Sequence, residues 1–208
     1  AAVEGVTSTI EIAPGTYPES VDATSKTLAL SAVGAGTGQI TLQGNLTLDS
    51  GNALAIDLQG TTAGSGYDQW VVNGTVNLGG NLLGVDGAQL ICTSNVTLPV
   101  GATFLIIDND QSDPISTRFL NLPDNASLAA PPNTSLLNIS YRAGTNANDV
   151  VLTAPGRYDF NGFGNHTEDD YMGVSPFQAK DGNTAGWVTA APYYLPWYFE
   201  RSDASEPG

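Results

Sequence analysis

Residues 39–58, QITLQGNLTLDSGNALAIDL, contain three short apolar runs separated by Gly, Asn, Asp and Ser. The last run, Leu54-Ala55-Ile56-Asp57-Leu58, alternates strictly in its large apolar residues. Successive side chains of a strand point to opposite faces, so Leu54, Ile56 and Leu58 are expected on one buried face. Gly, Asn, Asp and Ser are the residues that turns favour. The stretch therefore predicts short β-strands joined by tight corners.

The same pattern recurs along most of the chain, and no stretch longer than ten residues shows helical spacing of apolar residues. An all-β fold follows. Strands of three to five residues with very short corners favour stacked coils over a sandwich, because each coil buries its apolar side against the next. The expected strands are Thr9–Ile12, Thr27–Leu30, Ile40–Leu42, Leu46–Leu48, Leu54–Leu58, Trp70–Val72, Val76–Leu78, Leu82–Val85, Leu90–Cys92 and Phe104–Ile107.

Composition excludes several classes of function. The 208 residues include 6 Lys+Arg against 21 Asp+Glu, a formal net charge of -15. Nucleic acids and anionic membranes bind through basic patches, so neither is an expected partner. No run approaches the roughly 18 apolar residues of a membrane span. The single cysteine, Cys92, excludes an internal disulfide framework and a cysteine-based zinc cluster. The single histidine, His166, removes most histidine-dependent metal sites.

The N-terminal part resembles the first coil of pectate-lyase-like right-handed parallel β-helices, over about residues 9–42. The resemblance rests on a strand at Ile10–Ile12, a Pro14-Gly15 turn ending in Thr16-Tyr17, and a second strand at Lys26–Leu30. It implies a parallel β-helix, a fold that many surface proteins use without catalysis.

From residue 45 to about 154 the chain resembles bacterial autotransporter-associated β-strand repeat proteins and planctomycete-type large surface proteins. Three stretches carry this resemblance in the same order and spacing: GYDQWVVNGTVNLGG at 66–80, FLIIDND at 104–110 and NDVVLT at 148–153. Arg118 and Arg142 depart from the family pattern. The resemblance implies a right-handed β-solenoid that belongs to a secreted protein of the cell surface.

The amino-acid composition changes after Pro155-Gly156. Residues 157–201 hold two of the three Trp and five of the eight Tyr. This part resembles the start of the β-domain that follows such repeats in large surface proteins. We therefore expect a β-solenoid region at 1–155, and at 156–208 the start of a second β-domain, truncated and ending in a linker.

Two groups of side chains are candidate binding sites. Asp108, Asp110 and Asp113 offer three carboxylates on one turn, as a Ca²⁺ ion requires. The alternative is a turn whose Asp and Asn side chains bond nearby backbone amides. The second group, Trp187, Tyr193, Tyr194 and Trp197, would form either a sugar-stacking platform or the core of the second domain.

Catalysis is the weaker interpretation. No Lys or Arg lies in a lyase-like motif, and sequence alone does not show two carboxylates facing each other across a cleft. We expect a non-catalytic structural or adhesive segment of a secreted bacterial surface protein, with no cofactor other than possible Ca²⁺. Its partners would be neighbouring domains of the same polypeptide, other surface proteins or glycans. The alternatives are a carbohydrate-binding or polysaccharide-cleaving β-helix (a lyase or glycosidase) and a calcium-stabilised adhesion module.

Overall fold

The computed structural model describes residues 8–33, 38–109, 113–132, 136–144 and 147–155, and the backbone of 157–159 and 171–173. Every regular element in these ranges is a β-strand, which confirms the all-β class. The described residues contain no helix long and apolar enough to cross a membrane. The strands are β1 (Thr9–Ile12), β2 (Gly15–Tyr17), β3 (Val21–Asp22), β4 (Leu28–Ala32), β5 (Gln39–Leu42), β6 (Leu46–Thr47), β7 (Asn52–Leu58), β8 (Gln69–Val72), β9 (Val76–Asn77), β10 (Gln89–Ser94), β11 (Thr103–Asn109), β12 (Ser127–Ala129), β13 (Leu136–Ala143), β14 (Asp149–Thr153), β15 (Arg157–Asp159) and β16 (Tyr171–Gly173).

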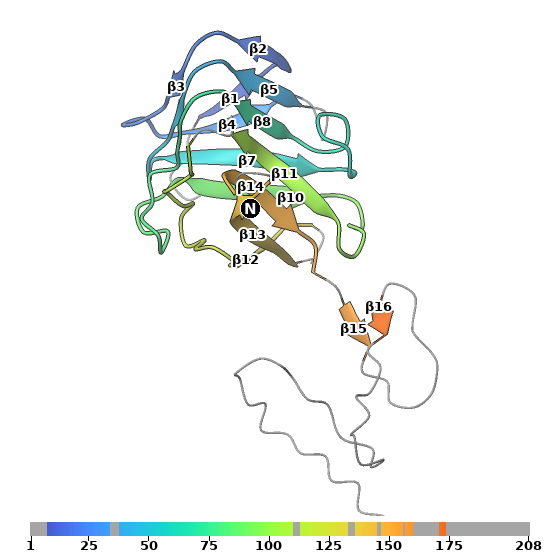
Figure 1. The fold of residues 1–208 in the computed structure, drawn as a ribbon. Coiled ribbons are helices and arrows are strands. Elements are labelled where there is room, and N and C mark those ends of the chain that lie inside the picture. Colours follow the sequence, from blue (N-terminus) through green and yellow to red (C-terminus); the bar gives the residue numbers. More distant parts are fainter. Residues whose placement is uncertain are drawn as a thin grey trace, which may run out of the picture. The chain divides into compact units, whose positions relative to one another are not determined.

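The first eleven strands are distributed over three sheets in rotation. One sheet has the order β1-β4-β7-β10, and a second contains β2, β5, β8 and β11. The third has the order β3-β6-β9. Figure 1 labels the strands of the first two sheets. Every pairing among these strands is parallel. The chain therefore lays down strand triplets, β1-β2-β3, β4-β5-β6 and β7-β8-β9, each paired strand for strand with the next.

The pairing changes direction after β11. Strand β14 is antiparallel to both β11 and β13, and β13 is antiparallel to β12. These strands extend the second sheet to seven, in the order β12-β13-β14-β11-β8-β5-β2. In Figure 1 this sheet runs from β2 at the top of the view down to β12. Antiparallel strands thus occupy the end of the sheet opposite β2.

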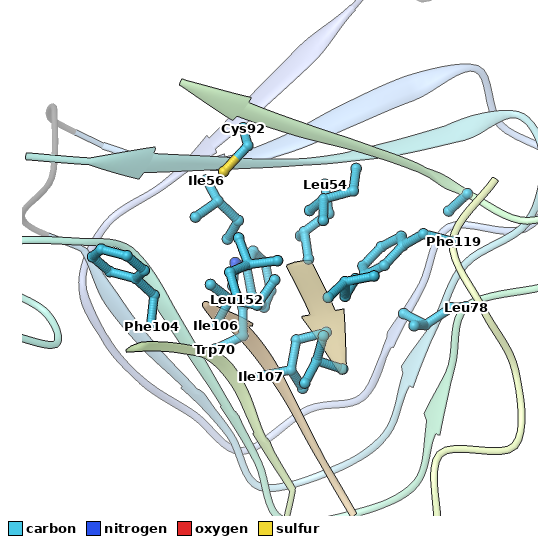
Figure 2. Close-up of a cluster of buried hydrophobic side chains, with 14 of the residues drawn as sticks. Leu54, Ile56, Trp70, Leu78, Cys92, Phe104, Ile106, Ile107, Phe119 and Leu152 are labelled. Atoms are coloured by element: carbon cyan, nitrogen blue, oxygen red, sulfur yellow. The ribbon is translucent and has the colours of Figure 1, made fainter. Parts of the chain in front are cut away.

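The core lies between the sheets. Leu54, Ile56 and Leu58 are buried together, as the alternation in β7 predicts, and Trp70 is fully buried on β8. Figure 2 shows Trp70 and Cys92 pointing into the same apolar interior as side chains from β11 and β14. One continuous core therefore joins the parallel and antiparallel strands.

One expected strand is wrong. Leu82–Val85 forms a turn, not a strand, and Leu82 and Leu83 are exposed. The side chain of Asn81 accepts hydrogen bonds from the backbone N–H groups of Leu83 (2.9 Å) and Val85 (3.2 Å). Gly84 has a φ of +77°, which a non-glycine residue rarely adopts. Local side-chain bonding here competes with the ladder that a strand would need.

The chain divides into two compact units, and the division falls near residue 157. The described part of the first unit contains the three sheets above. Strands β15 and β16 form a separate two-stranded sheet. The boundary at 155/156 and the identity of a second β-domain remain predictions.

Candidate functional site

Two of the three carboxylates predicted to bind calcium lie in the described part of the chain. Asp108 is half-buried on β11, and Asp113 follows the same strand. Asp110 lies outside the described residues. The Nδ2 group of Asn109 donates to the backbone oxygen of Asp113 at 2.7 Å. Among the described residues, no three Asp, Glu, His or Cys side chains form a group able to hold a metal ion. The predicted three-carboxylate site thus remains a prediction.

A different set of polar groups meets where β11 ends and β14 begins. The backbone N–H of Asn109 donates to Oδ1 of Asp149 at 3.0 Å, although these residues are 40 positions apart. The other carboxylate oxygen of Asp149 lies against Gly144, where it leaves no room for a Cβ. Asn148 precedes Asp149 and is 3% exposed. We call Asn109, Asp113, Asn148 and Asp149 the β11–β14 polar cluster.

Within the described part of the chain, three side-chain atoms of this cluster are buried without a hydrogen-bond partner. They are Oδ1 of Asn109 and both Oδ1 and Nδ2 of Asn148. A buried polar atom left unpaired costs about 1–3 kcal/mol of folding free energy. Buried amides are normally paired, so these atoms are unusual and mark a place where a polar ligand would be favourable.

The carboxylates around the cluster titrate above their ordinary range. Burial raises the pKa of Asp149, and the negative charge of Asp108 raises it further, against the opposing effect of the bond from Asn109. Burial also raises the pKa of Asp108. Two carboxylates are therefore held close to one another where β11 ends and β14 begins, and a nearby cation would stabilise both.

A second buried carboxylate links adjacent triplets. Asp68 is 1% exposed and accepts the backbone N–H groups of Gly38 (3.1 Å) and Asp57 (3.0 Å). Burial, reinforced by the charge of Asp57, raises the pKa of Asp68 to about 6. The carboxylate of Asp57 accepts the hydroxyl of Thr93 on β10. These contacts connect residues beside β5, β7 and β10, so they hold the stack together and do not form an open site.

Amide side chains also run from one triplet to the next. Nε2 of Gln39 donates to Oε1 of Gln69 at 2.7 Å, and Nε2 of Gln69 donates to the backbone oxygen of Leu105 at 3.0 Å. At a corner, the N–H of Thr75 donates to Oδ1 of Asn45 at 2.9 Å. Equivalent positions are 30 residues apart in these two side-chain pairs. The polar residues thus serve the contact between neighbouring triplets.

Arg118, one of the departures from the family pattern, is 4% exposed. Its Nη1 donates to the backbone oxygens of Ile115 (2.7 Å) and Thr117 (2.8 Å), and its guanidinium carbon lies 4.3 Å from the ring centroid of Tyr141. The hydroxyl of Tyr141 accepts the N–H of Phe119 (3.1 Å) and donates to the oxygen of Leu122 (2.9 Å). This network fixes the chain between β11 and β12.

The predicted sugar-stacking residues Trp187, Tyr193, Tyr194 and Trp197 lie outside the described residues. Sequence reasoning missed the β11–β14 polar cluster because its members come together only through pairing across 40 positions. The adjacent pair Asn148-Asp149 is visible in the stretch NDVVLT at 148–153, but nothing in its spacing shows that it would be buried.

The described fold defines an all-β protein with parallel strand triplets and antiparallel strands at one end. No protein-family model matches the chain, and no curated protein or solved structure matches it either.

Proposed function

We propose that the parallel part of the chain is a right-handed β-solenoid, and that the protein is a structural or adhesive segment of a large secreted bacterial surface protein. The observation that carries this proposal is that consecutive strands from β1 to β11 join the three sheets in turn, with parallel pairing throughout. In a stack of this kind each triplet bonds only to its neighbours, so the unit can be lengthened by repetition. Such stacks suit a stiff spacer that presents or joins other domains.

The side-chain contacts support a structural role. Asp68, the Gln39–Gln69 pair and the Asn45 corner all connect one triplet to the next. The formal charge of -15 favours solubility and opposes association between like copies. The resemblance to autotransporter-associated repeats adds the expectation of an extracellular location, with neighbouring domains, other surface proteins or glycans as partners.

Proteolysis of the full chain tests the structural role. We expect a fragment close to residues 8–155 to resist thermolysin, because cleavage within a stack requires local opening of paired strands. The variant Ile56→Asp places a charge at a fully buried position and should be digested rapidly. Equal digestion of wild type and variant at the triplet corners would count against a stiff stalk.

The non-catalytic part of the proposal has its own test. Polygalacturonate is incubated with the full chain, and absorbance at 235 nm is followed for the unsaturated products of a lyase. Reducing ends are measured in parallel for glycosidase activity. The proposal expects neither signal to exceed that of heat-unfolded protein, and a sustained increase in either one would replace it with the polysaccharide-cleaving alternative.

A further inference from the structure

We propose that the β11–β14 polar cluster binds a calcium ion through the side-chain oxygens of Asn109, Asn148 and Asp149 and the backbone oxygen of Asp113. This site differs from the turn predicted from sequence, because it requires neither Asp108 nor Asp110 as a ligand. It is also independent of whether the protein acts as a stalk.

Strand pairing brings the cluster together. Ile107 on β11 is the partner of Val150 on β14. Asn109 lies two residues after Ile107, and Asn148 lies two residues before Val150, so both flank the last printed pair of this antiparallel ladder. The two asparagines are 1% and 3% exposed, and Asp149 is 7% exposed. Two amide groups are thus buried where β11 ends and β14 begins.

Asn109 connects the remaining groups to this pair. Its backbone N–H donates to Oδ1 of Asp149 at 3.0 Å, so the carboxylate folds back over the strand end. Its Nδ2 donates to the backbone oxygen of Asp113 at 2.7 Å. The Oδ1 atom belongs to the same planar amide and has no partner. The residue that binds both the Asp149 carboxylate and the Asp113 carbonyl thus also carries a buried oxygen without a donor among the described residues.

The chemistry of these donors fits calcium. Ca²⁺ takes six to eight oxygen ligands, including carboxylates, amide and backbone carbonyls, and waters, in flexible geometry. The buried Oδ1 atoms of Asn109 and Asn148 are acceptors that such an ion would satisfy. The Nδ2 group of Asn148 would donate to a water that completes the shell. Mg²⁺ is smaller and demands near-ideal octahedral geometry, so it suits this mixed set less well.

The charge at the site sets the expected affinity. Asp149 is the only charged ligand, and Asp108 adds a second negative charge close enough to raise the pKa of Asp149. Sites with few charged ligands bind Ca²⁺ weakly, at about 10⁻⁴–10⁻³ M, as in extracellular modules. The site would be filled where calcium is present at millimolar concentration.

Thermal unfolding of the full chain tests the proposal. With 10 mM CaCl₂ in place of EDTA, the unfolding midpoint should rise by about 3–6 °C for a dissociation constant near 1 mM. MgCl₂ at the same concentration should give a smaller rise. The proposal is overturned if calcium produces no rise, or no greater rise than magnesium.

Three variants locate the ion. Asp149→Asn keeps an oxygen to accept the Asn109 N–H but removes the ligand charge, so the calcium response should be lost. Asp124→Asn is the matched control, because Asp124 also accepts a backbone N–H, from Tyr141 at 3.0 Å. The unfolding midpoint of this variant should still rise with calcium. Asp110→Asn should also keep the response. Loss in Asp110→Asn with retention in Asp149→Asn would instead support the turn predicted from sequence.

A gain-of-affinity variant covers the case in which Asp149→Asn fails to fold. Asn148→Asp adds a carboxylate ligand and should lower the calcium concentration for half-maximal stabilisation by about tenfold or more, because affinity rises with the number of charged ligands. An unchanged half-maximal concentration would contradict the assignment of Asn148.

Discussion

The parallel and antiparallel parts of the chain are held together in different ways. In the parallel part, residues 8–109, side-chain hydrogen bonds link neighbouring triplets at separate places, as in the Gln39–Gln69 and Asn45–Thr75 bonds. In the antiparallel part, residues 113–155, several side-chain contacts meet around Arg118 and Tyr141, in addition to the strand pairing. Long-range side-chain hydrogen bonds are therefore spread along the first part, whereas in the second part several of them meet at Tyr141.

The largest effect is expected where the two parts share the core. Trp70 is fully buried on β8, and Figure 2 shows it among Phe104, Ile106 and Leu152. Trp70→Ala should lower the free energy of unfolding by about 3–5 kcal/mol in urea titrations, because the side chain leaves a cavity. Leu82→Ala, at a side chain 64% exposed, should change it by less than about 0.5 kcal/mol. A change below about 1 kcal/mol for Trp70→Ala would show that the two parts do not share one core.

A smaller effect distinguishes the concentrated network from the distributed contacts. The Tyr141 hydroxyl makes two hydrogen bonds inside the protein, whereas the Tyr17 hydroxyl makes one, to the oxygen of Ala13 at an exposed position (2.7 Å). Tyr141→Phe should cost about 1–3 kcal/mol, because it leaves a buried donor and a buried acceptor without a partner. Tyr17→Phe should cost about 0.5 kcal/mol or less, since water replaces the lost bond. Equal losses of unfolding free energy for the two variants in urea titrations would show that the Tyr141 network is no more important for stability than the exposed Tyr17 bond.

The smallest effect is the pH dependence contributed by Asp68 in the parallel part. Its pKa is about 6 in the folded protein, above the ordinary value of 3.8. A raised carboxyl pKa means that the folded state binds the proton more tightly, so this group stabilises the fold as pH falls from about 6 to about 4. Asp68→Asn should reduce the gain in stability between pH 7.5 and pH 4.5 by on the order of 1 kcal/mol, after allowance for solvent screening.

The control for that measurement is Asp86→Asn, which changes an exposed carboxylate in a turn. Both variants remove one negative charge, so general repulsion within this acidic protein changes equally. If the two variants show the same pH profile, Asp68 does not carry the dependence.

Local pattern was sufficient to predict most of the strands but not the site. The alternation of Leu54, Ile56 and Leu58 depends only on neighbouring residues, and the burial it predicts is observed. The apolar run at Leu82–Val85 predicts a strand, but the hydrogen bonds that the Asn81 side chain accepts from backbone N–H groups stabilise a turn there. The burial of Asn109 and Asn148 depends on pairing between β11 and β14. No local pattern reports a contact across 40 residues.

The antiparallel end was likewise not predicted from sequence. Val150 and Leu152 alternate with polar or smaller positions, as they would in a parallel or an antiparallel strand. Strand direction is decided by the connection, and the short link between β13 and β14 permits only an antiparallel pair. Periodicity alone does not distinguish these cases.

The most direct test of the stacked-triplet arrangement is the register between β5 and β8. Thr41 and Val71 are partners in this parallel pair, and both are half-buried. The double variant Thr41→Cys with Val71→Cys should form a disulfide under mild oxidation, because neighbouring strands bring Cα atoms within the required range. Cys92 can stay in place, since burial raises the pKa of its thiol to about 12 and suppresses its reactivity.

The control pairs Thr41→Cys with Val72→Cys, which points to the opposite face of the sheet. The account predicts rapid disulfide formation in the first variant and little in the second, as measured by mass spectrometry before and after reduction. Efficient bonding in the second variant and none in the first would contradict the parallel stacking on which the proposed function depends.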